Sequence, residues 1–387
     1  MRKVEADALE VIELAGAGRF AELAERFTPR MREVVSAETV RVGWSVQTGG
    51  APCTPGVPAA EATTEDLFRV RTPVSCPAGD FVVVMSLDPA GRLHGLRLAP
   101  LAEQVWQPPR YAKPGRFTER DTGSGTLTLP RGAGPVPAVI LLPGGGVQDR
   151  DGTHGADKPL KDLAWGLASR GVAVLRWDKP MPEHTLTEEY VTPALTAVQE
   201  MCQEPTADPD RIFLLGHSLG GKVAPRVAAA SPMIAGLVLL AAEAMPMQRS
   251  AQRVVRHLAA RDPGPAADAM IAAVDRQVAT VDGDLGPDTP AADLPFGFPA
   301  SYWLDLRGYD PVRTAAELGR PMLILQGSRD HQVTVADDLA LWRAGLRDRK
   351  GVTIRVVRGA DHVFHRRGRH VTGAVIRRIA RWLRSAG

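Results

Sequence analysis

The sequence predicts an α/β protein with a mostly parallel, doubly wound sheet, preceded by a small α+β domain. Three observations predict this class. Short, nearly continuous apolar runs recur after residue 135, helical patterns separate them, and residues 40–112 carry shorter, alternating runs. Continuous apolar runs are typical of strands buried on both faces, and strands that alternate with helices form parallel sheets. We therefore expect a small domain at 1–112 and a larger one at 113–387.

Composition excludes several classes of protein. The 387 residues, 44% of them hydrophobic, can bury a core without disulfides or metals. A formal net charge of +3 is too small to indicate a nucleic-acid partner. No signal peptide and no apolar run of membrane-spanning length is visible, so we expect a cytoplasmic protein.

The three cysteines, Cys53, Cys76 and Cys202, are too few and too widely spaced for a disulfide framework. This usage favours a reducing compartment. Cys53 and Cys76 could pair if the protein were exported, but two unpaired thiols are the favoured interpretation.

The first domain begins with helical spacing over residues 4–27, interrupted at Gly16–Gly18. Strand patterns follow, and a turn signal at 88–91 joins the last two. The expected strands are 40–46, 81–87 and 93–98. A proline-rich connector at 106–115 places the boundary near residue 112. The role of this domain is open: it could shield a pocket entrance or mediate a homodimer.

The second domain alternates strands and helices. The expected strands are 136–142, 172–177, 211–216, 236–241, 322–326 and 352–357. The expected helices are 161–169, 187–204, 219–230, 336–345 and 368–385. Residues 243–318 interrupt the alternation with helical patterns and no strand, so we expect a helical cap inserted at about 243–310. Its candidate pocket residues are Phe296, Phe298, Tyr302 and Trp303, although the last two could equally form the core of the cap.

Residues 216–221, Gly-His-Ser-Leu-Gly-Gly, match the nucleophile-elbow pattern G-x-S-x-G. The pattern follows a buried strand directly and opens a helix, which is the context that it requires. We expect side chains at Gly216 or Gly220 to collide with neighbouring backbone. Ser218 is therefore the candidate nucleophile, favoured over a serine that only caps the helix.

Two further loops supply a base and an acid for this serine. Asp330 directly follows the strand 322–326, and His362 follows the last strand. Because carboxyl ends of parallel strands share one edge, we expect these side chains to meet Ser218 there. His331, His365 and His370 compete with His362, and Glu243 competes with Asp330. Glu243 is also a candidate pocket residue.

An oxyanion hole is expected from backbone amides near the serine. One donor should be Leu219, and the other should come from the glycines after the strand 136–142, first Gly145 and then Gly146.

Residues 115–387 resemble the α/β-hydrolase superfamily, and within it a bacterial esterase-like group. The resemblance rests on Gly145–Gly152 (Gly-Gly-Val-Gln-Asp-Arg-Asp-Gly), the elbow, and Gln326–Val333. It implies an α/β-hydrolase fold and hydrolysis of carboxylic esters or thioesters, with acyl transferases and peptidases among the relatives. Members often carry a small N-terminal domain.

The expected function is therefore hydrolysis of a small acyl substrate through an acyl-enzyme on Ser218. An acyltransferase or cyclase, and a ligand-binding protein without catalysis, are the alternatives. No cofactor or metal is implied. Asp149, Arg150 and Asp151 are expected to brace their loop, and Lys222 to pair with one of these acids. Seven arginines after Asp361 are interpreted as a solvated helix surface.

Overall fold

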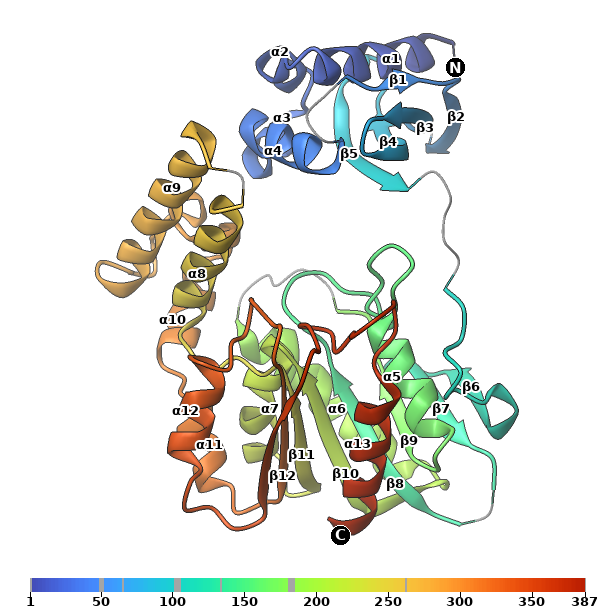
Figure 1. Ribbon diagram of the computed structural model, residues 1–387, viewed down its shortest axis with the longest axis vertical. Coiled ribbons are helices and arrows are strands. Elements are labelled where there is room, and N and C mark those ends of the chain that lie inside the picture. The colour runs from blue at the N-terminus through green and yellow to red at the C-terminus, as the bar shows by residue number, and fades with distance from the viewer. Residues whose placement is uncertain are drawn as a thin grey trace. The chain divides into compact units, whose positions relative to one another are not determined.

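The computed structural model describes residues 2–48, 52–64, 66–100, 106–132, 134–179, 185–261 and 263–386. The chain divides into two compact units, Met1–Val105 and Trp106–Gly387, and each is described by itself (Figure 1). Trp106 belongs to the second unit because its indole Nε1 donates to Asp162 Oδ1 at 3.0 Å. The proline-rich connector therefore lies within the second unit.

The first unit packs helices on an antiparallel sheet with the order β1-β3-β4-β5, and β2 pairs with β3. Its core includes Leu23, Phe27 and Met85, all at most 1% exposed. The helices are α1 (Arg2–Gly16), α2 (Phe20–Glu25), α3 (Pro29–Val34) and α4 (Ala37–Thr48). The strands are β1 (Thr54–Pro55), β2 (Ala59–Thr64), β3 (Leu67–Cys76), β4 (Gly79–Leu87) and β5 (Leu93–Pro100).

The strand expected at residues 40–46 is wrong, because this segment lies inside α4. The helix begins behind Ser36, whose Oγ accepts a hydrogen bond from Thr39 N at 3.1 Å. Capping of this kind satisfies a free amide of the first turn. It outweighs the strand preference of the β-branched residues that follow.

Cys53 and Cys76 form a disulfide, so the favoured interpretation as two unpaired thiols is wrong. The bond links the segment before β1 to the end of β3, and the pairing of Thr54 with Ser75 brings the two cysteines together. The cysteine count therefore no longer supports a reducing compartment, and the cytoplasmic location stays a prediction. No described helix is long and apolar enough to cross a membrane.

The second unit is built on an eight-stranded sheet with the order β13-β12-β11-β10-β8-β9-β7-β6. The six strands expected from the sequence are mutually parallel, while β6 and β7 add an antiparallel edge that the sequence analysis missed. The strands are β6 (Phe117–Asp121), β7 (Thr126–Pro130), β8 (Val136–Leu142), β9 (Ala173–Arg176), β10 (Ala207–His217), β11 (Ile234–Leu240), β12 (Met322–Gly327) and β13 (Val352–Val357).

Helices cover both faces of this sheet, as expected (Figure 1). They are α5 (Pro159–Ala168), the π-helical turn η2 (Thr187–Val191), α6 (Thr192–Gln203), α7 (Leu219–Ala229), α11 (Pro311–Glu317), α12 (Asp338–Gly345) and α13 (Gly373–Ser385); a short 3-10 turn, η1 (Pro114–Arg116), precedes β6. Alternate residues of each strand point to opposite faces. Ile140 and Leu142 pack with α6 and α7, whereas Val139 and Leu141 pack with α5 and α13.

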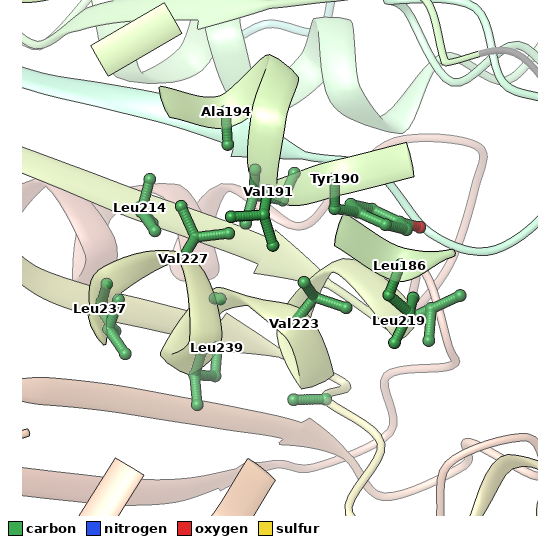
Figure 2. Close-up of a cluster of buried hydrophobic side chains, with 14 of the residues drawn as sticks. Leu186, Tyr190, Val191, Ala194, Leu214, Leu219, Val223, Val227, Leu237 and Leu239 are labelled. Atoms are coloured by element: carbon green, nitrogen blue, oxygen red, sulfur yellow. The ribbon is translucent and has the colours of Figure 1, made fainter. Parts of the chain in front are cut away.

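The elbow helix α7 is anchored by the cluster in Figure 2. Leu219, Val223 and Val227 pack against Leu214 of β10 and Leu239 of β11, all at most 1% exposed. Burying each such side chain contributes about 1.5–3 kcal/mol. The start of α7, which carries the candidate nucleophile, is therefore held firmly on the sheet.

The insertion between β11 and β12 is helical, and its described residues contain no strand. It consists of α8 (Met247–Ala259), α9 (Pro265–Asp282), the 3-10 turns η3 (Ala291–Asp293) and η4 (Pro295–Gly297), and α10 (Ala300–Arg307).

Candidate active site

Ser218 occupies a sharp turn between β10 and α7. Its backbone has φ 56° and ψ −120°, a region that residues other than glycine rarely adopt. A Cβ on Gly216 would lie 2.3 Å from the carbonyl oxygen of Gly220, and a Cβ on Gly220 would lie 2.3 Å from that of Leu142. The expected collision with neighbouring backbone is thus confirmed.

Asp330 and His362 are in direct contact. His362 Nδ1 lies 2.9 Å from Asp330 Oδ2, and the side chain of Asp330 is fully buried. Burial alone would raise the pKa of Asp330, but the hydrogen bond and charge of His362 and two backbone amides outweigh it, so the pKa is lowered. An ionised Asp330 requires the proton of the neutral imidazole to be on Nδ1, which leaves Nε2 free to accept one.

None of the competing histidines takes the place of His362. His331 stacks on His257 with the ring centroids 4.7 Å apart. His370 Nδ1 lies 3.1 Å from Asp162, and His365 is buried, with its Nε2 lacking a hydrogen-bond partner among the described residues. Among the described residues, the hydrogen bond of His362 Nδ1 goes to Asp330 and not to Glu243, the acid that competes with it.

His217 supports the loop of His362 from below. Its Nε2 donates to the backbone carbonyl oxygen of His362 at 2.9 Å. Burial and the neighbouring His362 lower the pKa of His217 to about 3, so this imidazole stays neutral near pH 7 and acts as a fixed hydrogen-bond donor.

Ser218 and His362 line one cavity of about 750 Å³ together with Gly145 and Gly146. Within the described chain, the Ser218 hydroxyl makes no hydrogen bond to His362. Catalytic hydrogen bonds are often long in sites without substrate and shorten in the complex.

The carbonyl groups of the glycine loop are bound from the side of the protein interior. Tyr190 Oη donates to the carbonyl oxygens of Gly144 at 2.8 Å and Pro143 at 3.1 Å. Lys179 Nζ donates to Gly146 O at 2.5 Å. Within the described residues, no group accepts a hydrogen bond from the amides of Gly145, Gly146 or Leu219. These amides therefore remain available to an anionic oxygen.

A buried ion pair holds this arrangement in place. Lys179 pairs with Glu189, and both side chains are 1% exposed. Tyr302 Oη donates to the second oxygen of Glu189 at 2.5 Å. Burial lowers the pKa of Lys179, and the charge of Glu189 opposes that shift. The sequence predicted no role for Lys179, Glu189 or Tyr190, because these residues meet only in the fold.

The cap contributes part of the cavity wall. Phe296, Phe298 and Met247 line the cavity, as does Glu243 at the end of β11. Tyr302 and Trp303, in α10 of the cap, do not line it; both are fully buried in the apolar core. The pocket interpretation of these two residues is therefore wrong, and their alternative role in the core is the one observed.

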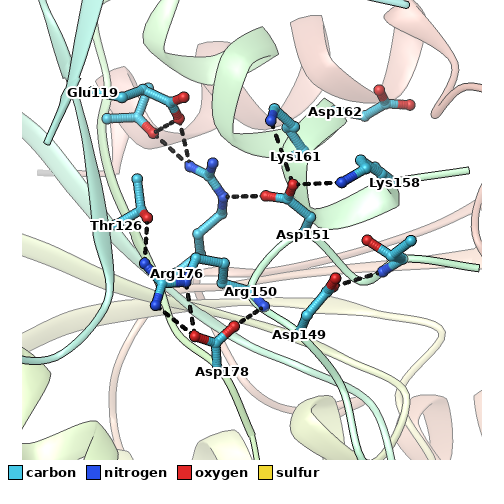
Figure 3. A network of polar contacts seen from close by, with 12 residues as sticks. Glu119, Thr126, Asp149, Arg150, Asp151, Lys158, Lys161, Asp162, Arg176 and Asp178 are labelled. Carbon is cyan, nitrogen blue, oxygen red and sulfur yellow. Dashed lines mark hydrogen bonds and ion pairs between the residues drawn. The ribbon is translucent and has the colours of Figure 1, made fainter. Parts of the chain in front are cut away.

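The loop after β8 is braced by ion pairs (Figure 3). Asp151 contacts Lys158 at 2.9 Å, Lys161 at 3.3 Å and Arg176 at 3.1 Å. Arg150 contacts Asp178 at 2.5 Å and Asp121 at 2.9 Å. The predicted brace is confirmed for Arg150 and Asp151. Asp149 instead accepts a hydrogen bond from the backbone amide of Thr153 at 2.8 Å.

The expected pairing of Lys222 with this loop is wrong. Lys222 is 2% exposed, and its Nζ donates to Met245 O at 2.5 Å. The physical reason is that Asp151 already has three cationic partners, while the carbonyl of Met245 lies within reach of α7. Among the described residues, no group of three or more histidine, cysteine or acidic side chains could hold a metal ion.

Comparison with known proteins identifies relatives. The profile described as "Alpha/beta hydrolase family" matches residues 139–372. Esterase EstD of Thermotoga maritima is 32% identical over 328 residues, which are 79% of this chain and 77% of that protein. The structure of Est1E from Butyrivibrio proteoclasticus has a TM-score of 0.45 at 15% identity and covers 70% of this chain and 98% of its own. The structure of an esterase of Pyrococcus furiosus has a TM-score of 0.46 at 16% identity, and the match covers 74% of this chain and 99% of that esterase.

Proposed function

Because the chain belongs to the alpha/beta hydrolase family and is a carboxylic ester hydrolase, we propose that it works through an acyl-enzyme on Ser218. His362 removes the proton of the Ser218 hydroxyl, and Asp330 holds the imidazole in the required tautomer. Ser218 Oγ attacks the ester carbonyl, and the protonated His362 gives its proton to the departing alcohol, which leaves the acyl-enzyme. Water then hydrolyses the acyl-enzyme with His362 as the base, which releases the acid and restores the Ser218 hydroxyl.

One observation carries the proposal: His362 is hydrogen-bonded to Asp330 at 2.9 Å and lines the same cavity as Ser218, whose backbone conformation is strained. The neutral His217 below supports the same loop. No other histidine of the described chain has this combination of a buried acid partner and a place beside a serine.

We assign the oxyanion hole to the amides of Leu219 and Gly145, with Gly146 as the second choice for the loop donor. Tyr190 and Lys179 bind the loop carbonyls, which supports this assignment because the amides of the same loop stay free. Loss of one such donor should raise the barrier by about 3 kcal/mol. The same acyl-enzyme can form from a thioester, so we include thioesters among the proposed substrates.

The test is Ser218→Ala, assayed on p-nitrophenyl esters and matched thioesters. We expect turnover to fall at least about 10⁴-fold, because the nucleophile is removed. A fluorophosphonate probe should label the wild-type protein and not the variant. Ser385→Ala, at an exposed serine of α13, is the control and should keep both properties. Undiminished turnover or labelling in Ser218→Ala would disprove the mechanism.

A further inference from the structure

Glu243 is an acid in the catalytic cavity that the proposed mechanism does not use. It follows β11 by three residues and lines the cavity together with Ser218 and His362. Its Oε2 is buried, and no described residue gives it a hydrogen bond. A buried acceptor without a partner is unfavourable, so such atoms in folded proteins usually have a partner outside the chain.

The charged groups around Glu243 already have partners. The Lys222 ammonium donates to the carbonyl of Met245. Asp338 accepts from the amides of Ala244 at 3.0 Å and Met245 at 3.1 Å, and from Arg253 at 3.0 Å. Burial raises the pKa of Glu243, and the charge of Lys222 opposes this rise without a bond between the two.

Glu243 is not needed as an alternative acid partner of His362. His362 Nδ1 is bonded to Asp330, whose remaining oxygen accepts from the amides of Gln332 at 2.9 Å and Val333 at 3.0 Å. The imidazole therefore already has its acid, and that acid is fixed in place.

The rest of the cavity is also more polar than a plain alkyl ester needs. Asp157 Oδ1 and His365 Nε2 are two further buried atoms without partners in the described chain, and both residues line the cavity. Phe296, Phe298 and Met247 supply its apolar wall. Unpartnered polar atoms in a cavity of about 750 Å³ indicate a ligand that brings its own polar groups.

We propose that Glu243 is a specificity-determining residue, which accepts a hydrogen bond from a hydroxyl or ammonium group of the substrate at a distance from the scissile carbonyl. The natural substrate is then a small ester that carries such a donor. This inference rests on the proposed function, because it concerns the same cavity.

The test compares esters that differ only at one chain end. On the acyl side, p-nitrophenyl hexanoate is compared with its 6-hydroxy and 6-ammonio analogues. On the alcohol side, the acetate of pentanol is compared with the monoacetates of 1,5-pentanediol and 5-aminopentanol. On either the acyl or the alcohol side, the wild-type protein should hydrolyse a donor-bearing ester with a kcat/KM at least about tenfold higher than that of its methyl-ended counterpart. Comparison of the hydroxyl-bearing and ammonium-bearing esters shows which of the two groups is the preferred donor.

Two variants connect any preference to Glu243. Glu243→Leu removes the acceptor and should bring the ratio of kcat/KM values close to one. Glu243→Gln keeps a carbonyl oxygen, so it should retain a hydroxyl preference and lose most of an ammonium preference. Glu317→Gln, an exposed acid of α11, should leave the ratio unchanged. The ratio is informative even if a variant loses stability, because both substrates meet the same folded fraction.

A wild-type ratio of one or less on both sides, or a preference that survives both Glu243 substitutions, would overturn the inference. Either result leaves the acyl-enzyme mechanism standing as long as Ser218→Ala is inactive. Failure of the wild-type protein to hydrolyse any of these esters would instead count against the proposed function.

Discussion

Asp330 shows how the proposed chemistry depends on the contacts of a single side chain. Its Oδ2 accepts hydrogen bonds from His362 Nδ1 and from Gln326 Nε2, both at 2.9 Å. Its Oδ1 accepts from the amides of Gln332 and Val333. A carboxylate with this many donors is held ionised and in one orientation.

We expect Asp330→Asn to lower kcat about 10⁴-fold, because an amide at this position favours the wrong imidazole tautomer. The measurement is kcat on a p-nitrophenyl ester, with circular dichroism to check the fold. Asp348→Asn, at an exposed acid outside the cavity, is the control. A decrease of less than tenfold would show that Asp330 does not orient the base.

Sequence reasoning located the residues that motifs mark and missed those that only the fold brings together. Ser218, Asp330 and His362 follow strand ends, and parallel strands bring their ends to one edge. Lys179, Glu189 and Tyr190 come from other segments, and nothing in their spacing indicates that they bind the glycine loop. The predicted partner of Lys222 was wrong, because the sequence shows that Lys222 and Asp151 both follow strands of the same sheet edge but not that Asp151 already contacts three other cations.

At the scale of elements, the continuous apolar strands were all predicted, whereas several exposed or interrupted strands were not. Strands β8, β10, β11 and β12 each contain an apolar run of at least four residues, whereas the edge strand β13 is interrupted by Thr353 and Arg355. By contrast, β6 is exposed along most of its length, and β3 contains Pro73, a residue that argues against a strand. Helix α4 was missed because its β-branched residues resemble a strand pattern.

The loop between β8 and α5 depends on Asp151, which contacts three cations, two at the start of α5 and one in β9 (Figure 3). Burial raises the pKa of Asp151, but the bond from Lys158 and the charges of Arg176 and Lys161 lower it overall. Its contribution to stability is therefore present above the unfolded-state pKa of about 4 and lost as the pH falls through the lower pKa of the folded state.

We expect Asp151→Asn to reduce the free energy of unfolding by about 3 kcal/mol at pH 7, because Arg176 loses one of its buried anionic partners. The difference from the wild-type protein should shrink as the pH falls toward 2. Urea unfolding at several pH values measures both. Asp149→Asn is the matched control, because the side chain of Asp149 has only a backbone partner among the described residues, and an asparagine oxygen can accept the same hydrogen bond. A difference independent of pH would contradict the assigned charge effect.

At the scale of the whole molecule, the chain combines a catalytic unit with a smaller unit that has its own core. The proposed triad, the glycine loop and the cavity all belong to Trp106–Gly387. The disulfide between Cys53 and Cys76 belongs to Met1–Val105 and closes a loop of 23 residues. Stability and activity should therefore respond to different changes.

Replacing both Cys53 and Cys76 with serine should destabilise the first unit by about 3 kcal/mol, because the unfolded chain regains the entropy of an open loop of this length. Calorimetry should show one transition moving to lower temperature while the transition of the catalytic unit and the rate of ester hydrolysis stay the same. Cys202→Ser, at the free cysteine of α6, is the control. If ester hydrolysis were lost together with the first transition, the catalytic unit would require the first unit in its folded state. The first unit would then act directly on catalysis, and the proposed site would be incomplete without it.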